Sequence, residues 1–184
     1  MEASSAEGPI TSRLIIRAAR AADARATATI RVHGWQAAYR GQLPDDLLDD
    51  LSVEGDAIRF ADHLRHLPPG RRLWVAEVDG ELVGFASTGP ARDEDAHGAA
   101  EVYAIYVRPD LIGRGIGQRL LDHAVRDLAD QGYREATLWT LATNLPAQRF
   151  YERAGWRADG ASKQDRLDRF ELNENRYRRM LSPD

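Results

Sequence analysis

The sequence predicts an α/β fold built on one mixed sheet. At 184 residues, the chain has the length of a single domain. Asp79-Gly80 lies between two short apolar stretches, a pattern that is typical of a β-hairpin and therefore of antiparallel strands. Residues 101–141 run as strand, glycine-rich turn, helix and strand, the order of a βαβ unit with two parallel strands. Together these patterns predict a mixed sheet covered by helices.

The first third of the chain is expected to form one strand and two helices. Residues 14–18 are apolar and predict the first strand, and Asp23 is a candidate N-cap for a helix that runs to about Tyr39. A more polar helical stretch follows at about residues 54–67, closed by Pro68, Pro69 and Gly70.

The rest of the chain alternates strands and helices. The hairpin strands are expected at residues 73–78 and 82–88, and a polar loop at residues 90–98. The order expected after that loop is a buried strand at 101–107, the glycine-rich turn, a helix ended by Gly132, a strand at 136–141, a helix at 146–154 ended by Gly155, and a last strand near 175–181.

Composition excludes several classes of protein. The net charge of −4 gives no reason to expect a nucleic acid partner, and the chain has no apolar run long enough to span a membrane. No cysteine is present, so disulfides, thiolate metal sites and an enzyme-thiol intermediate are excluded, and no histidine cluster predicts a metal site. Residues 1–12 do not resemble a signal peptide, so we expect a disordered leader, a single domain over 13–184 and a cytoplasmic protein.

The glycine-rich turn is the most informative segment. Gly113, Gly115 and Gly117 leave the backbone free to bend and to approach a ligand, and the following helix begins with unpaired N–H groups and the positive end of its dipole. Both features favour a phosphate or pyrophosphate, and Arg114 and Arg119 add positive charge. The spacing fits neither the dinucleotide GxGxxG fingerprint nor a P-loop. A tight turn without a ligand remains the alternative.

Two motifs give a resemblance to a known family. Residues 107–117 read V-x-P-x-x-x-G-x-G-x-G, and residues 144–156 read N-x-x-A-x-x-F-Y-x-x-x-G-W. In this order and spacing they resemble the acyl-coenzyme A loop and the following helix of the GNAT N-acetyltransferase superfamily. Ile112 departs from the pattern, since the family usually has Gln or Arg there. The resemblance implies a mostly antiparallel sheet with a central parallel βαβ unit and helices on both faces.

The resemblance implies acetyl-CoA as cosubstrate. Backbone groups of Ile105 and Val107 would bind the pantetheine arm, and the Val107 N–H would polarise the thioester carbonyl. Asn144 would contact the cofactor, although it could also be an ordinary turn residue. The whole implied binding set is Ile105, Val107, Ile112, Gly113, Arg114, Gly115, Ile116, Gly117, Gln118, Asn144, Ala147 and Phe150.

Two residues are candidates for the chemistry. By resemblance, Tyr151 would be the general acid that protonates the leaving thiolate, since a phenol is protonated at neutral pH; the alternative is a packing aromatic beside Phe150. Glu101 would be the base that deprotonates the amine, often through water; the alternative is an ordinary residue at the start of a strand. Because the chain has no cysteine, no acetyl-cysteine intermediate can form. The acetyl group would therefore pass directly from acetyl-CoA to the amine in a ternary complex.

The sequence therefore predicts an acetyl-CoA-dependent N-acetyltransferase acting on an unidentified primary amine. A non-catalytic acyl-CoA-binding or sensor domain of the same fold is the alternative, and a nucleotide-phosphate-binding domain is a third. Residues 93–95 could attract a cationic amine or form a solvated turn, and Trp35 and Tyr39 could line the acceptor groove or the core. Residues 166–179 predict a solvated hairpin, and a homodimer is compatible with the resemblance.

Overall fold

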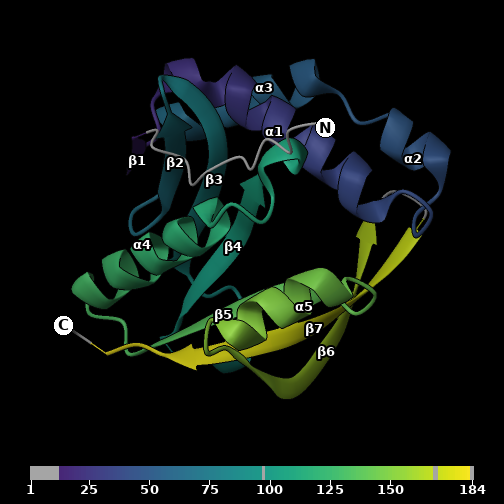
Figure 1. The fold of residues 1–184 in the computed structure, drawn as a ribbon. Helices are drawn as coiled ribbons and strands as arrows, with labels where there is room; N and C mark the ends of the chain where they lie inside the picture. Colours follow the sequence, from purple (N-terminus) through teal and green to yellow (C-terminus); the bar gives the residue numbers. More distant parts are fainter. Residues whose placement is uncertain (1–12, 97, 168–169, 183–184) are drawn as a thin grey trace, which may run out of the picture.

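The chain folds around one mixed β-sheet (Figure 1). The computed structural model describes residues 13–182 except 97 and 168–169, so the predicted leader at residues 1–12 lies outside the described residues. The strands are β1 (Leu14–Ala18), β2 (Arg72–Val78), β3 (Glu81–Pro90), β4 (Ala100–Val107), β5 (Glu135–Leu141), β6 (Arg157–Leu167) and β7 (Phe170–Met180). The α-helices are α1 (Ala24–Tyr39), α2 (Asp45–Asp49), α3 (Val53–Arg65), α4 (Ile116–Asp130) and α5 (Leu145–Arg153).

The sheet confirms the predicted mixture of strand directions. Its order is β1-β2-β3-β4-β5-β7-β6, and among the described strands β4 and β5 form the parallel pair while their other neighbours are antiparallel. The β2–β3 hairpin turns at Asp79-Gly80, where both residues have positive φ. Helix α4 provides the crossover from β4 to β5 that a parallel pair requires.

Helices cover both faces of the sheet, as expected. On one face, Ile30 of α1 packs with Leu73, Val75 and Phe85, together with residues of α3. On the other face, Leu120 of α4 packs with Ala76 and Ala86. Helix α5 covers the β5–β7 part of the sheet, and Tyr151 lies there in a cluster that includes Leu138 and Tyr177 (Figure 1).

Four local expectations need correction. Asp23 makes no capping bond to α1, because its carboxylate binds the guanidinium of Arg17 at 2.7 Å. Helix α2 was not expected, since it has only five residues. Residues 157–165 of β6 were not expected either, since they read RADGASKQD, a polar stretch with glycine. The C-terminal hairpin is only partly solvated: Leu172, Arg176 and Tyr177 are buried.

Strand β4 changes partners along its length. It pairs with β5 only at Ala100, Glu101 and Val102. Its register with β3 shifts at the next residue, since Val102 faces Thr88 and Ala104 faces Ser87, which leaves Tyr103 as an extra residue. A bulge of this kind bends a strand and increases its twist. Beyond it, β4 and β5 diverge, and the sheet opens between them.

Candidate active site

A cleft of about 940 Å³ lies where β4 and β5 separate. The end of α1, the second half of β4, the loop before α4, the end of β5, helix α5 and the β6–β7 hairpin all contribute to its walls. Each of these elements therefore brings side chains or backbone to one space, although they are distant in sequence. An open position in the sheet creates the site, because within the described part of the chain no strand pairs with this side of β4 beyond Val102.

The free edge of β4 presents backbone groups to the cleft. The N–H of Arg108 donates to the carbonyl of Val83 in β3 at 2.9 Å. Backbone polar groups of successive strand residues point to alternate sides, so Ile105 and Val107 direct theirs away from β3. Both residues line the cleft. A ligand with amide groups can therefore bind there as an additional strand does.

The glycine loop has the conformation that its sequence predicts. Gly113 and Gly115 have φ of 86° and 82°, and a Cβ on either would meet open space, so glycine is needed for backbone conformation rather than for packing. Gly115 is the N-cap of α4 and offers no side chain to its first N–H groups. Ile116 is buried and anchors the start of the helix. The helix N-terminus is thus open to an anion.

Helix α5 is held in place by its first residue. Asn144 is the N-cap: its side-chain oxygen accepts from the N–H of Ala147 at 3.2 Å, and its Nδ2 donates to the hydroxyl of Tyr39 at 3.2 Å. The Gln148 amide donates to the carbonyls of Leu141 and Ala142 at 3.1 and 3.0 Å, which fixes the helix to the end of β5. The turn-residue interpretation of Asn144 is confirmed, and Asn144 also lines the cleft.

Tyr151 lies at the wall of the cleft with 8% of its surface exposed. Burial, with smaller contributions from Tyr106 and Tyr39, raises the pKa of its hydroxyl. The phenol is therefore protonated at neutral pH. Its ring packs among Phe150, Trp156 and Tyr177, so the packing role considered from the sequence is real as well.

Two more tyrosines complete a polar cluster in the cleft. Tyr106 accepts a 2.6 Å hydrogen bond from Nε1 of Trp35, and burial raises its pKa. Burial also raises the pKa of Tyr39, and the negative charge of Glu174 raises it further. Tyr39, Tyr106, Tyr151 and Glu174 all line the cleft.

Glu101 does not belong to this group. Its side chain is 1% exposed, and it accepts two hydrogen bonds from the guanidinium of Arg92, at 2.5 and 3.1 Å, and one from the Arg92 backbone N–H at 3.1 Å. This pair holds the pKa of Arg92 above its usual value. Glu101 lies at the paired end of β4 and does not line the cleft, although the next residue, Val102, does.

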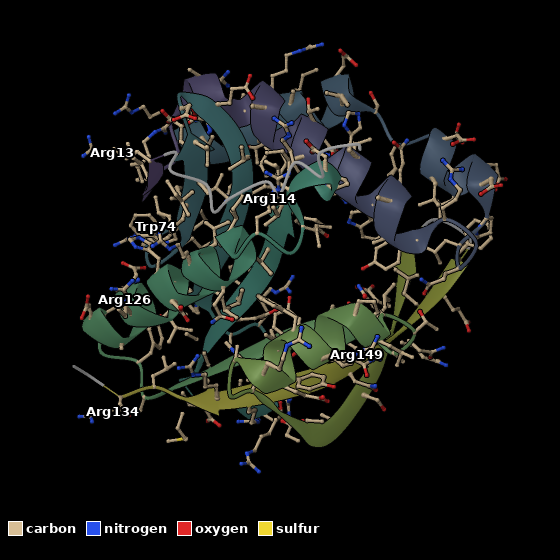
Figure 2. All side chains as sticks on the ribbon, viewed as in Figure 1. Arg13, Trp74, Arg114, Arg126, Arg134 and Arg149 are labelled. Carbon is tan, nitrogen blue, oxygen red and sulfur yellow. The ribbon has the colours of Figure 1, made fainter. Side chains whose placement is uncertain are left out.

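Most of the predicted cofactor residues meet at the cleft. Of the implied set, Ile116 is buried behind the loop and Arg114 is exposed beside the cleft, on the loop before α4 (Figure 2). The others line the cleft: Ile105, Val107, Ile112, Gly113, Gly115, Gly117, Gln118, Asn144, Ala147 and Phe150.

The sequence did not reveal three further cleft residues. Tyr106 and Trp139 lie inside predicted strands, where alternation gives only the face on which a side chain lies, and Glu174 lies in the predicted solvated hairpin. The acidic loop is neither free nor simply solvated, because Asp93 and Asp95 bind the buried Arg176 at 3.2 and 2.6 Å. Among the described residues, no cluster of three or more potential ligands could hold a metal ion, and no helix could span a membrane.

The fold and the cleft define a class of protein that binds an extended, phosphate-bearing cofactor between a strand edge and a helix N-terminus. Comparison with known proteins identifies the family. Residues 32–156 match the acetyltransferase (GNAT) family, so the chain belongs to it. This confirms the predicted fold and the predicted enzyme class, an N-acetyltransferase that uses acetyl-CoA.

Individual relatives differ in how much they share with the chain. An uncharacterised N-acetyltransferase of Bacillus subtilis is 28% identical over 137 residues, which cover 74% of this chain and 76% of that one. A mycothiol acetyltransferase of Streptomyces coelicolor is 40% identical over 84 residues, 46% of this chain but only 26% of that protein. The PaiA N-acetyltransferase of Thermoplasma acidophilum, solved with coenzyme A, shares the fold with a TM-score of 0.64 at 18% identity, covering 89% of this chain and 98% of that one.

Proposed function

We propose that the protein transfers an acetyl group from acetyl-CoA directly to a primary amine bound in the same cleft. The observation that carries this proposal is the free edge of β4, which ends at the open N-terminus of α4 on one side and faces Tyr151 on the other. Strand edge, anion site and proton donor lie in one space of about 940 Å³. The absence of cysteine leaves no enzyme thiol to carry the acetyl group.

The loop and the strand would divide the binding of the cosubstrate. Gly113, Gly115 and the first N–H groups of α4 suit the pyrophosphate, because they offer donors and positive dipole without side chains in the way. Ile105 and Val107 suit the amide-containing pantetheine arm. The N–H of Val107 would stabilise the negative charge that builds on the thioester carbonyl oxygen.

Tyr151 would stabilise the departing sulfur. Tyr151 lines the cleft, and its protonated hydroxyl would donate a hydrogen bond to the sulfur as negative charge develops. Desolvation raises the pKa of a thiol for the same reason that it raises the pKa of the phenol. Burial in the cleft therefore favours the protonated form of both groups.

The base role predicted for Glu101 is not part of this proposal. Its carboxylate is buried against Arg92, which belongs to the loop before β4, at the end of β4 that pairs with β5. A base must be within hydrogen-bond reach of the amine, directly or through one water. The amine would therefore give its proton to water in the cleft. As its nitrogen bonds to the acetyl carbon, the C–S bond breaks, the sulfur takes the proton of Tyr151, and water returns a proton to Tyr151.

The proposal is tested by calorimetry and by release of free thiol. We expect acetyl-CoA and CoA to bind and ATP not to bind. A panel of primary amines should then contain members that cause stoichiometric thiol release, with the acetyl group found on the amine by mass spectrometry. Binding of acetyl-CoA without amine-dependent release across the panel would contradict transfer to amines, and ATP-only binding would contradict the cofactor assignment.

A further inference from the structure

The only lysine of the chain contacts two residues that line the cleft. The chain has 24 arginines but only one lysine, Lys163 on β6. Its ammonium lies 3.3 Å from the Glu174 carboxylate and 4.3 Å from the centre of the Trp139 ring. Glu174 and Trp139 both line the cleft. A primary ammonium group, the chemical group of the expected acceptor, is thus already bound there.

The sheet register explains why these three side chains meet. Glu174 of β7 pairs with Lys163 on one side and with Leu141 of β5 on the other. Trp139 is two residues before Leu141, so it lies on the same face of the sheet. A carboxylate beside an aromatic face binds an ammonium by charge and by cation–π attraction.

Glu174 differs from the three aspartates that bind Arg176. Asp93, Asp95 and Asp159 each bind the guanidinium of Arg176, which is 5% exposed. Glu174 instead pairs with an ammonium whose side chain is 33% exposed and has a flexible four-carbon stem. Release of Lys163 therefore leaves no buried cation unpaired, and it leaves the partly buried Glu174 carboxylate available to another ammonium.

The ammonium site adjoins the proposed reaction centre. Glu174, Tyr39, Tyr106 and Tyr151 all line the same cleft. Trp35 and Tyr106, joined by their hydrogen bond, add an aromatic wall to the same cleft. Such walls suit an acceptor whose amine is attached to an apolar or aromatic body.

We propose that Glu174 and Trp139 bind the ammonium group of the acceptor, and that Lys163 occupies this site until an acceptor displaces it. This inference rests on the proposed function for its biological meaning, but the ammonium site can be tested without turnover. The predicted ligand class is a primary amine, cationic in solution, with an apolar or aromatic body.

The single lysine provides its own probe. Protein labelled with ¹³C,¹⁵N-lysine has one lysine side-chain signal, from Lys163. In the CoA complex, titration with 2-phenylethylammonium should shift this signal to saturation, whereas neutral 2-phenylethanol should leave it unchanged. Glu174→Gln should weaken binding of the probe at least tenfold. The matched control is Glu171→Gln, which makes the same change at an exposed position on the opposite face of β7 and should bind as the wild type does.

Two results would overturn the inference: an unshifted lysine signal at saturating probe, or equal probe affinity in wild type and Glu174→Gln. Lys163→Met gives an independent check, because removing the internal competitor should tighten probe binding at least threefold by calorimetry; unchanged affinity would contradict the occupancy of the site by Lys163. CoA affinity, measured on the same samples, should stay within twofold in every variant. If CoA itself does not bind, the proposed function fails while the lysine signal still reports on the ammonium site.

Discussion

The two ends of β4 differ in what they contact. At its start, Glu101 is fully enclosed and is held by three hydrogen bonds from Arg92, and the strand has a neighbour on each side. At its end, Ile105 and Val107 have β3 on one side and the cleft on the other. The first end of β4 is thus part of the interior of the sheet, and the second end is an edge that a ligand can bind.

The extra residue at Tyr103 separates the two ends. Before it, β4 runs parallel to β5; after it, the strands diverge and the backbone groups on that edge have no strand partner. Position along β4 therefore decides whether a residue supports the fold or contacts a ligand. The residue type alone does not decide this. Glu101, at the paired end, contacts only structural partners, whereas Glu174 on β7 lines the cleft.

The largest effect is expected at the open end, for Tyr151→Phe. Loss of the hydroxyl should lower kcat by about 10²–10³-fold, because a positioned proton donor commonly contributes that much. The ring still packs with Phe150 and Trp156, so the melting temperature and the CoA dissociation constant should stay close to wild type. Steady-state kinetics and calorimetry check this, and an unchanged kcat would remove Tyr151 from the mechanism.

Glu101→Gln should act on stability instead. The amide keeps one acceptor but turns its NH2 group toward the Arg92 guanidinium, so we expect the free energy of unfolding to fall by about 1–3 kcal/mol. The pH profile of kcat/KM should coincide with that of the wild type. Denaturation by urea and a pH–rate series measure both quantities. If Glu101→Gln instead removed the low-pH limb of the kcat/KM profile and left the free energy of unfolding unchanged, Glu101 would be the base. That result would contradict a purely structural role for the paired end of β4.

A matched pair of glycines tests the loop at the open end. Gly115 and Gly98 have φ of 82° and 83°, and a Cβ on either meets open space, so alanine should cause similar strain of about 1–2 kcal/mol at both. Gly98 belongs to the loop before β4 and does not line the cleft, whereas Gly115 does. Only Gly115→Ala should weaken CoA binding, by about fivefold. Equal CoA affinity in the two variants would show that the loop conformation is not needed.

The smallest effect is expected for Asp95→Asn, near the paired end of β4, as a change in thermal stability that depends on pH. The hydrogen bonds from Arg176 lower the pKa of Asp95 from 3.8 to about 2. Because the pKa is lower in the folded protein, this pair stabilises the fold above about pH 4, and its contribution disappears as the pH falls toward 2. The melting temperature of Asp95→Asn should thus be slightly below wild type at pH 6 and equal to it near pH 2. A difference that persists at pH 2 would contradict this pairing.

The fold could be predicted in large part from local patterns. The Asp79-Gly80 turn and the βαβ order gave the strand directions, because turn chemistry and crossover length are local properties. The start of β6 could not be predicted, since its polar sequence is held in the sheet by pairing with β7 rather than by its own propensity. Helix α2 depends on the burial of Leu48, a tertiary contact.

The candidate site was predictable where one segment forms it. The glycine loop and residues 144–151 are continuous motifs, and the structure brings them to one cleft. Glu174, Trp139 and Lys163 meet only through the register of three strands, which no local pattern reveals. The environment of Glu101 depends on Arg92, nine residues away in an irregular loop.

Backbone amide exchange along β4 tests the division of this strand most directly. In ¹⁵N-labelled protein, saturating CoA should slow hydrogen exchange at the N–H groups of Ile105 and Val107 at least tenfold, because the pantetheine arm would take the place of the missing strand. The N–H of Glu101 should exchange at the same rate with and without CoA. Unchanged exchange at Ile105 and Val107 in the saturated complex would contradict the account.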